Sequence, residues 1–214
     1  MEFLTHSGAG TSAAHGMTGP VLRRGRQGAS ARLVPAWLAL SLWLSLLPLA
    51  SQLQAQAPDN LLEYQVKAAF LLNFTKFVEW PAATFRAPDA SVTICVMGED
   101  PFGAILDRTL EGESVNNHAI RAQRLLPDGD LRSCHILFIS RSERERFAQI
   151  VSRLRGSSVL TVSELPGFVD AGGMIEFTVE EGKARFYINA ATAAAGGLKL
   201  SSRLLRVAKE VRGS

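Results

Sequence analysis

Two cysteines and two histidines are the residues after position 57 whose side chains most readily do chemistry, as metal ligands, nucleophiles or proton carriers. They are Cys95, Cys134, His118 and His135. Zinc ligands in protein sequences come in closely spaced pairs such as C-x-x-C, and these four residues show no such spacing. His135 opens an apolar run beside Cys134, which favours a structural role, and His118 lies in a polar segment, which favours solvent exposure. The sequence therefore predicts no metal site and no cofactor.

The usual catalytic sequence patterns are also missing. The glycine pairs at 172–173 and 196–197 do not lie between a strand and a helix, as a phosphate-binding loop requires. No G-x-S-x-G sequence marks a nucleophilic serine. Glu143 and Glu145 alternate with arginines, a pattern typical of a solvated helix face. We therefore expect a protein that is not an enzyme. The enzymatic alternative is a reaction that uses His118 with a carboxylate.

Three polar or aromatic residues near the first long apolar segment suggest binding. Asn73 interrupts an apolar helical face, and a buried amide must be hydrogen-bonded, so it either ties to backbone or lines a pocket. Trp80 and Phe85 flank Pro81, where aromatic side chains serve either as a lid on the core or as a binding platform. These residues give two hypotheses: a ligand pocket formed by Asn73 and Trp80, and a partner-binding surface that includes Trp80 and Phe85.

The C-terminal segment 190–211 predicts one helix, or two helices broken at glycines 196–197. One side of it carries a basic stripe formed by Lys199, Arg203, Arg206 and Lys209. Such a stripe is either a solvated face favoured by the helix C-terminus or a docking surface for an acidic partner or lipid headgroups. Lys199, Arg203 and Arg206 therefore join Trp80 and Phe85 as candidates for partner binding.

Residues 1–57 have the features of a leader. Four arginines between positions 23 and 32 precede the apolar run Leu33–Ala50, and small residues follow it. This order is typical of a secretory signal peptide, with cleavage expected after Ala55. A membrane anchor is the alternative because the apolar run has 18 residues, near the lower limit for a span. We therefore expect a removable leader at 1–57 and one domain at 58–214.

Removal of the leader changes the charge of the chain. The full sequence has 23 Lys and Arg against 20 Asp and Glu, and four arginines and Glu2 precede residue 58. The remainder has 19 basic and 19 acidic residues and a formal net charge of zero. Nucleic-acid binding needs a basic surface, so nucleic acid is not an expected partner.

The two cysteines have two interpretations. Export places them in an oxidising compartment, where an even number of cysteines favours a disulfide. Cys95 and Cys134 both lie in apolar, strand-like runs, so two separate buried thiols are the alternative.

The spacing of apolar residues predicts an α/β fold. Residues 61–81 form the first helix, and its apolar face is expected to contain Leu62, Val66, Ala69, Phe70, Phe74 and Phe77. Strand-like and helical runs then follow one another from 91 to 162. Two alternating runs, 174–179 and 184–188, flank a turn with Gly182 and predict an antiparallel hairpin. We expect a mostly parallel central sheet with helices on both faces and this C-terminal antiparallel hairpin.

Three long segments carry a family resemblance: YQVKAAFLLNFTKFVEWP (64–81), GGMIEFTVEEGKARFYIN (172–189) and AAGGLKLSSRLLRVAK (194–209). CHILFIS (134–140) fits the same pattern. The chain resembles the YfiR-like family of periplasmic proteins, which repress an inner-membrane diguanylate cyclase of the YfiN type. The resemblance implies an α/β fold, export, no catalysis and a redox-sensitive disulfide between Cys95 and Cys134. A second cysteine pair found in members of this family is missing, since 169–176 contains no cysteine.

The resemblance therefore predicts a periplasmic regulatory binding protein that represses a membrane diguanylate cyclase through its periplasmic part and lowers cyclic-di-GMP output. A periplasmic small-molecule-binding protein without a cyclase partner is the alternative. The two can coexist, with a ligand tuning repression. A homodimer is compatible with both.

Overall fold

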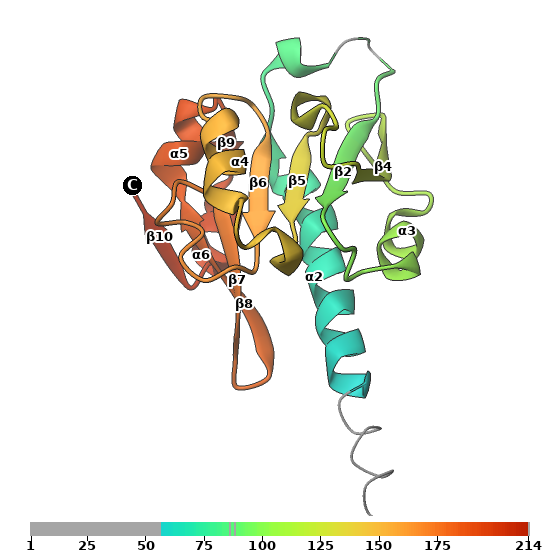
Figure 1. Ribbon diagram of the computed structural model, residues 1–214. Helices are drawn as coiled ribbons and strands as arrows, with labels where there is room; N and C mark the ends of the chain where they lie inside the picture. Colours follow the sequence, from blue (N-terminus) through green and yellow to red (C-terminus); the bar gives the residue numbers. More distant parts are fainter. Residues whose placement is uncertain (1–56, 86, 88, 214) are drawn as a thin grey trace, which may run out of the picture. The chain divides into compact units, whose positions relative to one another are not determined.

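The computed structural model describes residues 57–85, 87 and 89–213 (Figure 1). Apart from Ala57, the leader predicted from the sequence lies outside the described residues. Within those ranges, no helix combines the length and the apolar character needed to cross a membrane.

The centre of the fold is an eight-stranded sheet with the order β10-β8-β7-β6-β5-β2-β4-β3. In chain order the strands are β2 Val92–Met97, β3 Ser114–Val115, β4 His118–Leu125, β5 Ile136–Ile139, β6 Leu160–Ser163, β7 Ile175–Glu180, β8 Lys183–Asn189 and β10 Glu210–Arg212. Among the described residues, five of the seven neighbouring pairs are parallel, and β7–β8 and β3–β4 are antiparallel. The predicted α/β class is confirmed. The sheet is mixed, so the expectation of a mostly parallel sheet holds only in part.

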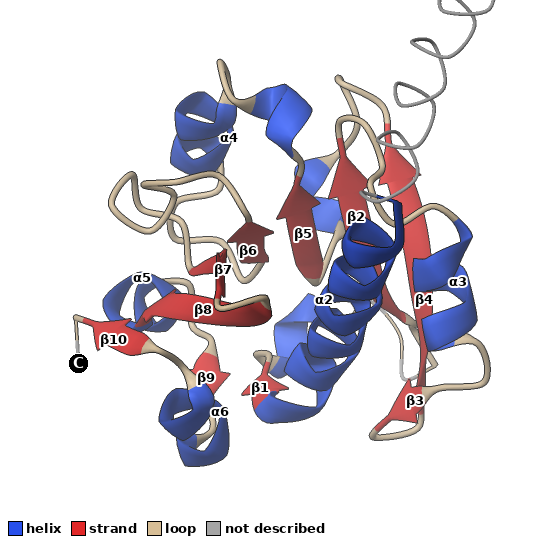
Figure 2. Cartoon of the chain, turned by 90° about the horizontal axis from the view of Figure 1, so that it is seen from below, coloured by secondary structure: helices blue, strands red, loops and turns tan. Residues whose placement is uncertain are grey.

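Helices lie on both faces of this sheet (Figures 1 and 2). They are α2 Ala57–Phe77, α3 Ala104–Leu110, α4 Phe147–Arg153, α5 Ala190–Ala195 and α6 Ser202–Val207. Side chains alternate between the two faces along each strand. In β2, Ile94 and Val96 pack in the core beneath α2, whereas Cys95 and Met97 pack in a second core that includes residues of α4.

The predicted hairpin is present as β7 and β8, joined by Glu181 and Gly182. Both turn residues have positive φ, 49° and 71°. This conformation twists the chain to match the right-handed twist of the strands, and Gly182 adopts it without a steric penalty. The hairpin projects from the lower edge of the sheet in Figure 1.

The C-terminal segment contains two helices on either side of glycines 196–197, one of the two predicted alternatives, but an unpredicted strand lies between them. α5 ends at glycines 196–197, where Gly197 takes a φ of 75°. Lys199–Leu200 then forms β9, which pairs with β1, Val78–Glu79, in a separate two-stranded sheet. The Ser201 side chain accepts a hydrogen bond from Leu204 N–H (3.2 Å) and caps the short α6. The predicted continuous basic stripe is therefore wrong, because Lys199 lies in a strand and only Arg203 and Arg206 share a helix.

Candidate functional site

α2 is apolar on two faces, and the sheet covers only one of them. Tyr64, Ala68, Leu71 and Phe74 pack in the core. The face predicted from the sequence is largely the other one, on which Leu62 is 61% exposed. Helical spacing does not single out the core face of a helix that is apolar nearly all round, which explains why the predicted face is wrong. The second face remains open to solvent.

This second face of α2 forms one wall of a groove whose other wall comes from β8, the hairpin and α6. The groove consists of two hollows, of about 340 and 440 Å³, that share Phe70 and Ala184. We call it the α2–β8 groove. Its lining residues are Leu62, Glu63, Val66, Phe70, Asn73, Phe74, Phe77, Val179, Gly182, Lys183, Ala184, Arg185, Phe186, Arg203, Leu204 and Val207.

The floor of the groove is a cluster of phenylalanine rings. The ring centroid of Phe186 lies 5.2 Å from that of Phe70 and 5.4 Å from that of Phe74, both in edge-to-face arrangements. Phe177 packs against the same cluster from β7, 5.9 Å from Phe70. Phe74 and Phe186 are buried, whereas Phe70 is half-buried and faces the groove. Buried rings packed in this way give the floor a fixed shape.

Exposed apolar side chains gather at the rim of the groove. The described residues include six large hydrophobic side chains that are exposed, and four of them line the groove: Leu62, Val66, Val179 and Val207. Single exposed apolar residues are ordinary, but a cluster that borders a hollow marks a site of interaction. We therefore take the α2–β8 groove as the candidate functional site.

The two hollows differ in charge. Arg185 and Arg203 line the hollow next to α6, which contains no acidic residue. Neither arginine forms an ion pair with any residue in the described part of the chain. The Arg203 guanidinium lies 5.7 Å from the ring centroid of Phe77, within the range of a cation–π contact. The other hollow contains both Lys183 and Glu63. The groove is thus basic at the α6 end.

The structure separates the two residues of the predicted ligand pocket. Asn73 lies in the α2–β8 groove and is exposed, so it does not need the buried partner expected from the sequence. Trp80 follows β1 and lines a different hollow, of about 230 Å³, together with Phe85 and His118. The expected common pocket of Asn73 and Trp80 is therefore not formed.

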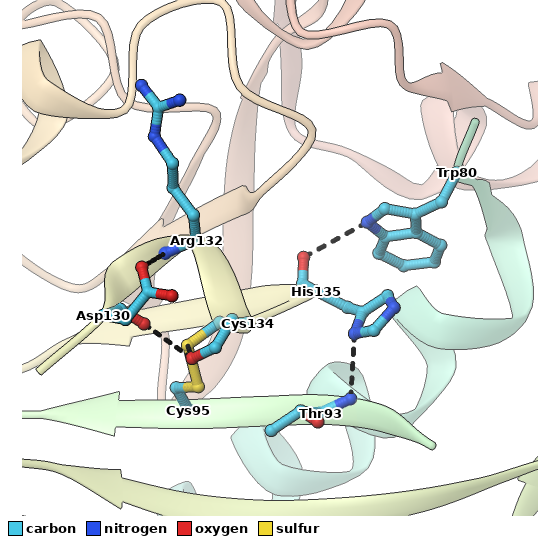
Figure 3. The surroundings of a disulfide bond; sticks show 8 residues. Trp80, Thr93, Cys95, Asp130, Arg132, Cys134 and His135 are labelled. Carbon is cyan, nitrogen blue, oxygen red and sulfur yellow. Dashed lines mark hydrogen bonds between the residues drawn. A yellow bond between two sulfur atoms is a disulfide. The ribbon is translucent and has the colours of Figure 1, made fainter. Parts of the chain in front are cut away.

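Trp80 and Phe85 instead surround His135, and Figure 3 shows Trp80 beside it. The indole N–H of Trp80 donates to the His135 carbonyl oxygen at 3.2 Å, and the Thr93 backbone N–H donates to His135 Nδ1 at 3.1 Å. Burial, and secondarily the nearby charge of His118, holds the pKa of His135 below its ordinary value. A neutral ring that accepts at Nδ1 carries its proton on Nε2. This arrangement favours the first of the two roles considered for Trp80 and Phe85, a lid over the edge of the core.

A disulfide joins Cys95 of β2 to Cys134, just before the neighbouring strand β5 (Figure 3). Their Cα atoms are 5.8 Å apart, within the usual range. β2 and β5 are neighbouring parallel strands with Leu137 opposite Cys95, and Cys134 precedes β5 at the bend at His135. Both cysteines are at most 1% exposed and belong to the core on the α4 face, so the bridge lies inside the protein.

A buried ion-pair network joins α2 to the carboxyl end of the sheet. Lys67 is 1% exposed and forms ion pairs with Glu63 and Glu164. Glu164 also accepts a hydrogen bond from the Tyr64 hydroxyl at 2.8 Å and forms an ion pair with Arg141, whose Nε lies 2.9 Å away. Burial raises the pKa of Tyr64, and the hydrogen bond to Glu164 raises it further. This network was not predicted from the sequence. A sequence signal for this network is Lys67. It is a charged residue three positions after Tyr64 and therefore lies on the same side of the helix, which the core covers.

The described residues show no arrangement suited to metal binding. No group of three or more histidine, cysteine or carboxylate side chains among them is close enough to hold an ion. His118 Nδ1 contacts the Ala90 carbonyl oxygen at 2.6 Å, and its ring stacks on Phe85 with centroids 4.3 Å apart. Both contacts are those of a structural histidine.

The described residues thus combine a mixed α/β sheet with an open apolar groove. The model of the YfiR/HmsC-like family matches residues 64–209, which is more than half of the chain. The protein belongs to this family, as its sequence segments indicated. No curated protein matches the chain in sequence.

Proposed function

We propose that this protein is a periplasmic regulator that binds the periplasmic part of an inner-membrane diguanylate cyclase and keeps the cyclase inactive. The observation that carries the proposal is the YfiR/HmsC-like match over residues 64–209, which suggests a regulator of this kind. The matched segment includes most of α2, the hairpin and α6, and so nearly all of the α2–β8 groove. Binding to the inactive state of the cyclase shifts its population toward that state and lowers cyclic-di-GMP output.

The surface of α6 supports a role in this contact. Arg203 and Arg206 are exposed, lie on one short helix and form no ion pair within the described residues. Arg203 also lines the groove. We assign these two arginines to the partner contact. Lys199 of β9, together with Trp80 and Phe85, is a second set of candidates on neighbouring elements.

The 340 Å³ hollow also favours a second candidate function, the binding of a small molecule. Its volume suits a small ligand, and aromatic rings, two guanidinium groups and the Asn73 amide line it. A ligand in this hollow would compete with a protein partner for the same surface. Such a ligand would therefore relieve repression.

Deletion of the gene is expected to raise cellular cyclic-di-GMP, and the wild-type gene is expected to restore the low level. Complementation with the Arg203→Glu, Arg206→Glu double variant is expected to restore repression only weakly, because reversed charges repel an acidic partner surface. Since charges at an interface act mainly on the association rate, the difference from wild type should shrink as ionic strength rises. Cyclic-di-GMP measured in cell extracts, with purified proteins compared for partner binding at several salt concentrations, checks this result.

The matched control is Arg153→Glu with Arg155→Glu, which reverses two exposed arginines at and after the end of α4. This variant is expected to repress like wild type. Unchanged cyclic-di-GMP on deletion would refute the regulatory function. Full repression by the Arg203 and Arg206 variant would remove α6 from the contact and leave Trp80 and Phe85 to be tested.

Export is expected to be directed by the N-terminal segment. Residues 1–60 fused to a reporter that is active only outside the cytoplasm are expected to give signal, and the exported protein is expected to begin near Gln56. N-terminal sequencing of the periplasmic protein measures the cleavage site. A membrane-embedded product that retains residues 1–57 would instead support the anchor.

A further inference from the structure

The α2–β8 groove is long enough to bind a helix. Its α2 wall extends from Leu62 to Phe77. At 1.5 Å per residue this stretch is about 22 Å long, the length of about four helical turns. Half-buried Phe70 lies at the junction of the two hollows, so the apolar floor continues from one to the other. An amphipathic helix that inserts its apolar face into such a groove is a recurring mode of protein recognition.

The charges along the groove indicate which occupant it fits. The lining contains three cations, Arg185, Arg203 and Lys183, and a single carboxylate, Glu63. Glu63 is already paired with Lys67. Two of the cations lie at the α6 end, without an acidic neighbour in that hollow. A complementary occupant therefore carries carboxylates at the end that meets α6.

The same charges and shape disfavour two other occupants. A second copy of this chain docked groove to groove would place three cations opposite three cations, and like charges across an interface are costly. Two concave surfaces would also leave space between them. A lipid surface is flat on this scale and suits a projecting apolar face, whereas Val66 and Val207 stand at the rim of a hollow.

We propose that the α2–β8 groove binds an amphipathic helix of about four turns that carries carboxylates at one end, supplied by the protein partner. The apolar side of that helix packs between Val66 of α2 and Val207 of α6, over the phenylalanine floor. Its carboxylates pair with Arg185 and Arg203. The inference rests on the proposed function for the identity of the partner and adds to it the surface used and the chemistry of the segment bound.

A synthetic peptide tests the surface without the cyclase. The peptide has about 16 residues, leucines at i, i+4, i+7 and i+11, and two glutamates in its first turn, where they also favour the helix. The mature protein is expected to bind it. A peptide with lysines in place of the glutamates, or a protein with Val66→Glu and Val207→Glu, is expected to bind at least about tenfold more weakly. Leu126→Glu is the matched control, since Leu126 is 72% exposed and does not line the groove.

Fluorescence anisotropy with labelled peptide gives the dissociation constants. Circular dichroism checks that each variant is folded. The variants are expected to fold because Val66 and Val207 are exposed and glutamate is a good helix former. Failure of the glutamate peptide to bind at millimolar concentration overturns the proposal, as does equal binding of the two peptides. If the protein binds anionic vesicles and Val66→Glu abolishes this binding, the groove is a lipid site. If the protein forms a dimer that Val66→Glu dissociates, the groove binds a second copy. Either result overturns the proposal.

Complementation in cells separates this inference from the proposed function. The Val66→Glu, Val207→Glu variant is expected to fail to restore low cyclic-di-GMP, and Leu126→Glu is expected to restore it. If deletion raises cyclic-di-GMP but the groove variant represses fully, the groove proposal fails and the regulatory function stands. If deletion has no effect but the peptide binds as expected, the groove stands and the regulatory function fails.

Discussion

Replacement of Glu164 by alanine is expected to lower the free energy of unfolding by about 3–5 kcal/mol, because it breaks a buried ion pair from one side. The Glu164 carboxylate accepts hydrogen bonds from Lys67 and the Tyr64 hydroxyl and forms an ion pair with Arg141. Lys67, 1% exposed, would keep only Glu63, and Tyr64 would keep a buried hydroxyl without its acceptor. Urea unfolding followed by circular dichroism measures the loss.

The control is Glu113→Ala, which removes the partner of Lys76, another lysine of α2. The Lys76–Glu113 pair lies at the surface, with both side chains 38% exposed, so its loss is expected to cost less than about 1 kcal/mol. A double-mutant cycle with Lys67→Met and Glu164→Ala is expected to give less than the sum of the single losses, since the double variant leaves no buried lysine without its Glu164 partner. A Glu164→Ala loss as small as that of Glu113→Ala would show that the network contributes little.

Removal of the disulfide by Cys95→Ala and Cys134→Ala is expected to destabilise the protein by about 4 kcal/mol in the chain-entropy model, given a sequence separation of 39 residues. Alanine avoids placing a hydroxyl in the apolar core on the α4 face. Urea unfolding of the oxidised wild type and of the variant gives the difference. The reduced wild type, unfolded in excess dithiothreitol, should match the variant, and a loss below about 1 kcal/mol would contradict the expectation.

The burial of this bridge bears on redox control. Thiol–disulfide exchange requires a thiolate to reach a sulfur atom, and both cysteines are at most 1% exposed. Reductant is therefore expected to act only as fast as the protein opens. If redox state does regulate this chain, it does so through stability and not through a surface switch.

The sequence predicted the elements whose pattern is local. The strand-like runs around Cys95 and Cys134 correspond to β2 and β5, and the hairpin followed from alternation on either side of Gly182. In each case the side-chain period and the turn residue indicate the same structure.

Features that depend on distant contacts were not predictable in this way. β9 is only two residues long and exists because Val78 and Glu79 pair with it. The side of α2 that meets the sheet also carries Lys67, whose partner Glu164 is 97 residues away. Because α2 turns this side toward the sheet, Val66 lies on the outside and the groove stays open. The residue spacing within α2 alone contains no information about this orientation.

The strand order also determines which strand lies at the edge of the sheet, where a strand of another chain could add by backbone hydrogen bonds. β10, with only three residues, is the outermost strand on one side, and it occupies the edge of the seven-residue β8. Its Glu210 and Arg212 place charge on that edge, which discourages the addition of a further strand. A truncation before Glu210 would expose the hydrogen-bonding edge of β8. The truncated chain is therefore expected to aggregate under conditions in which the full chain stays in solution.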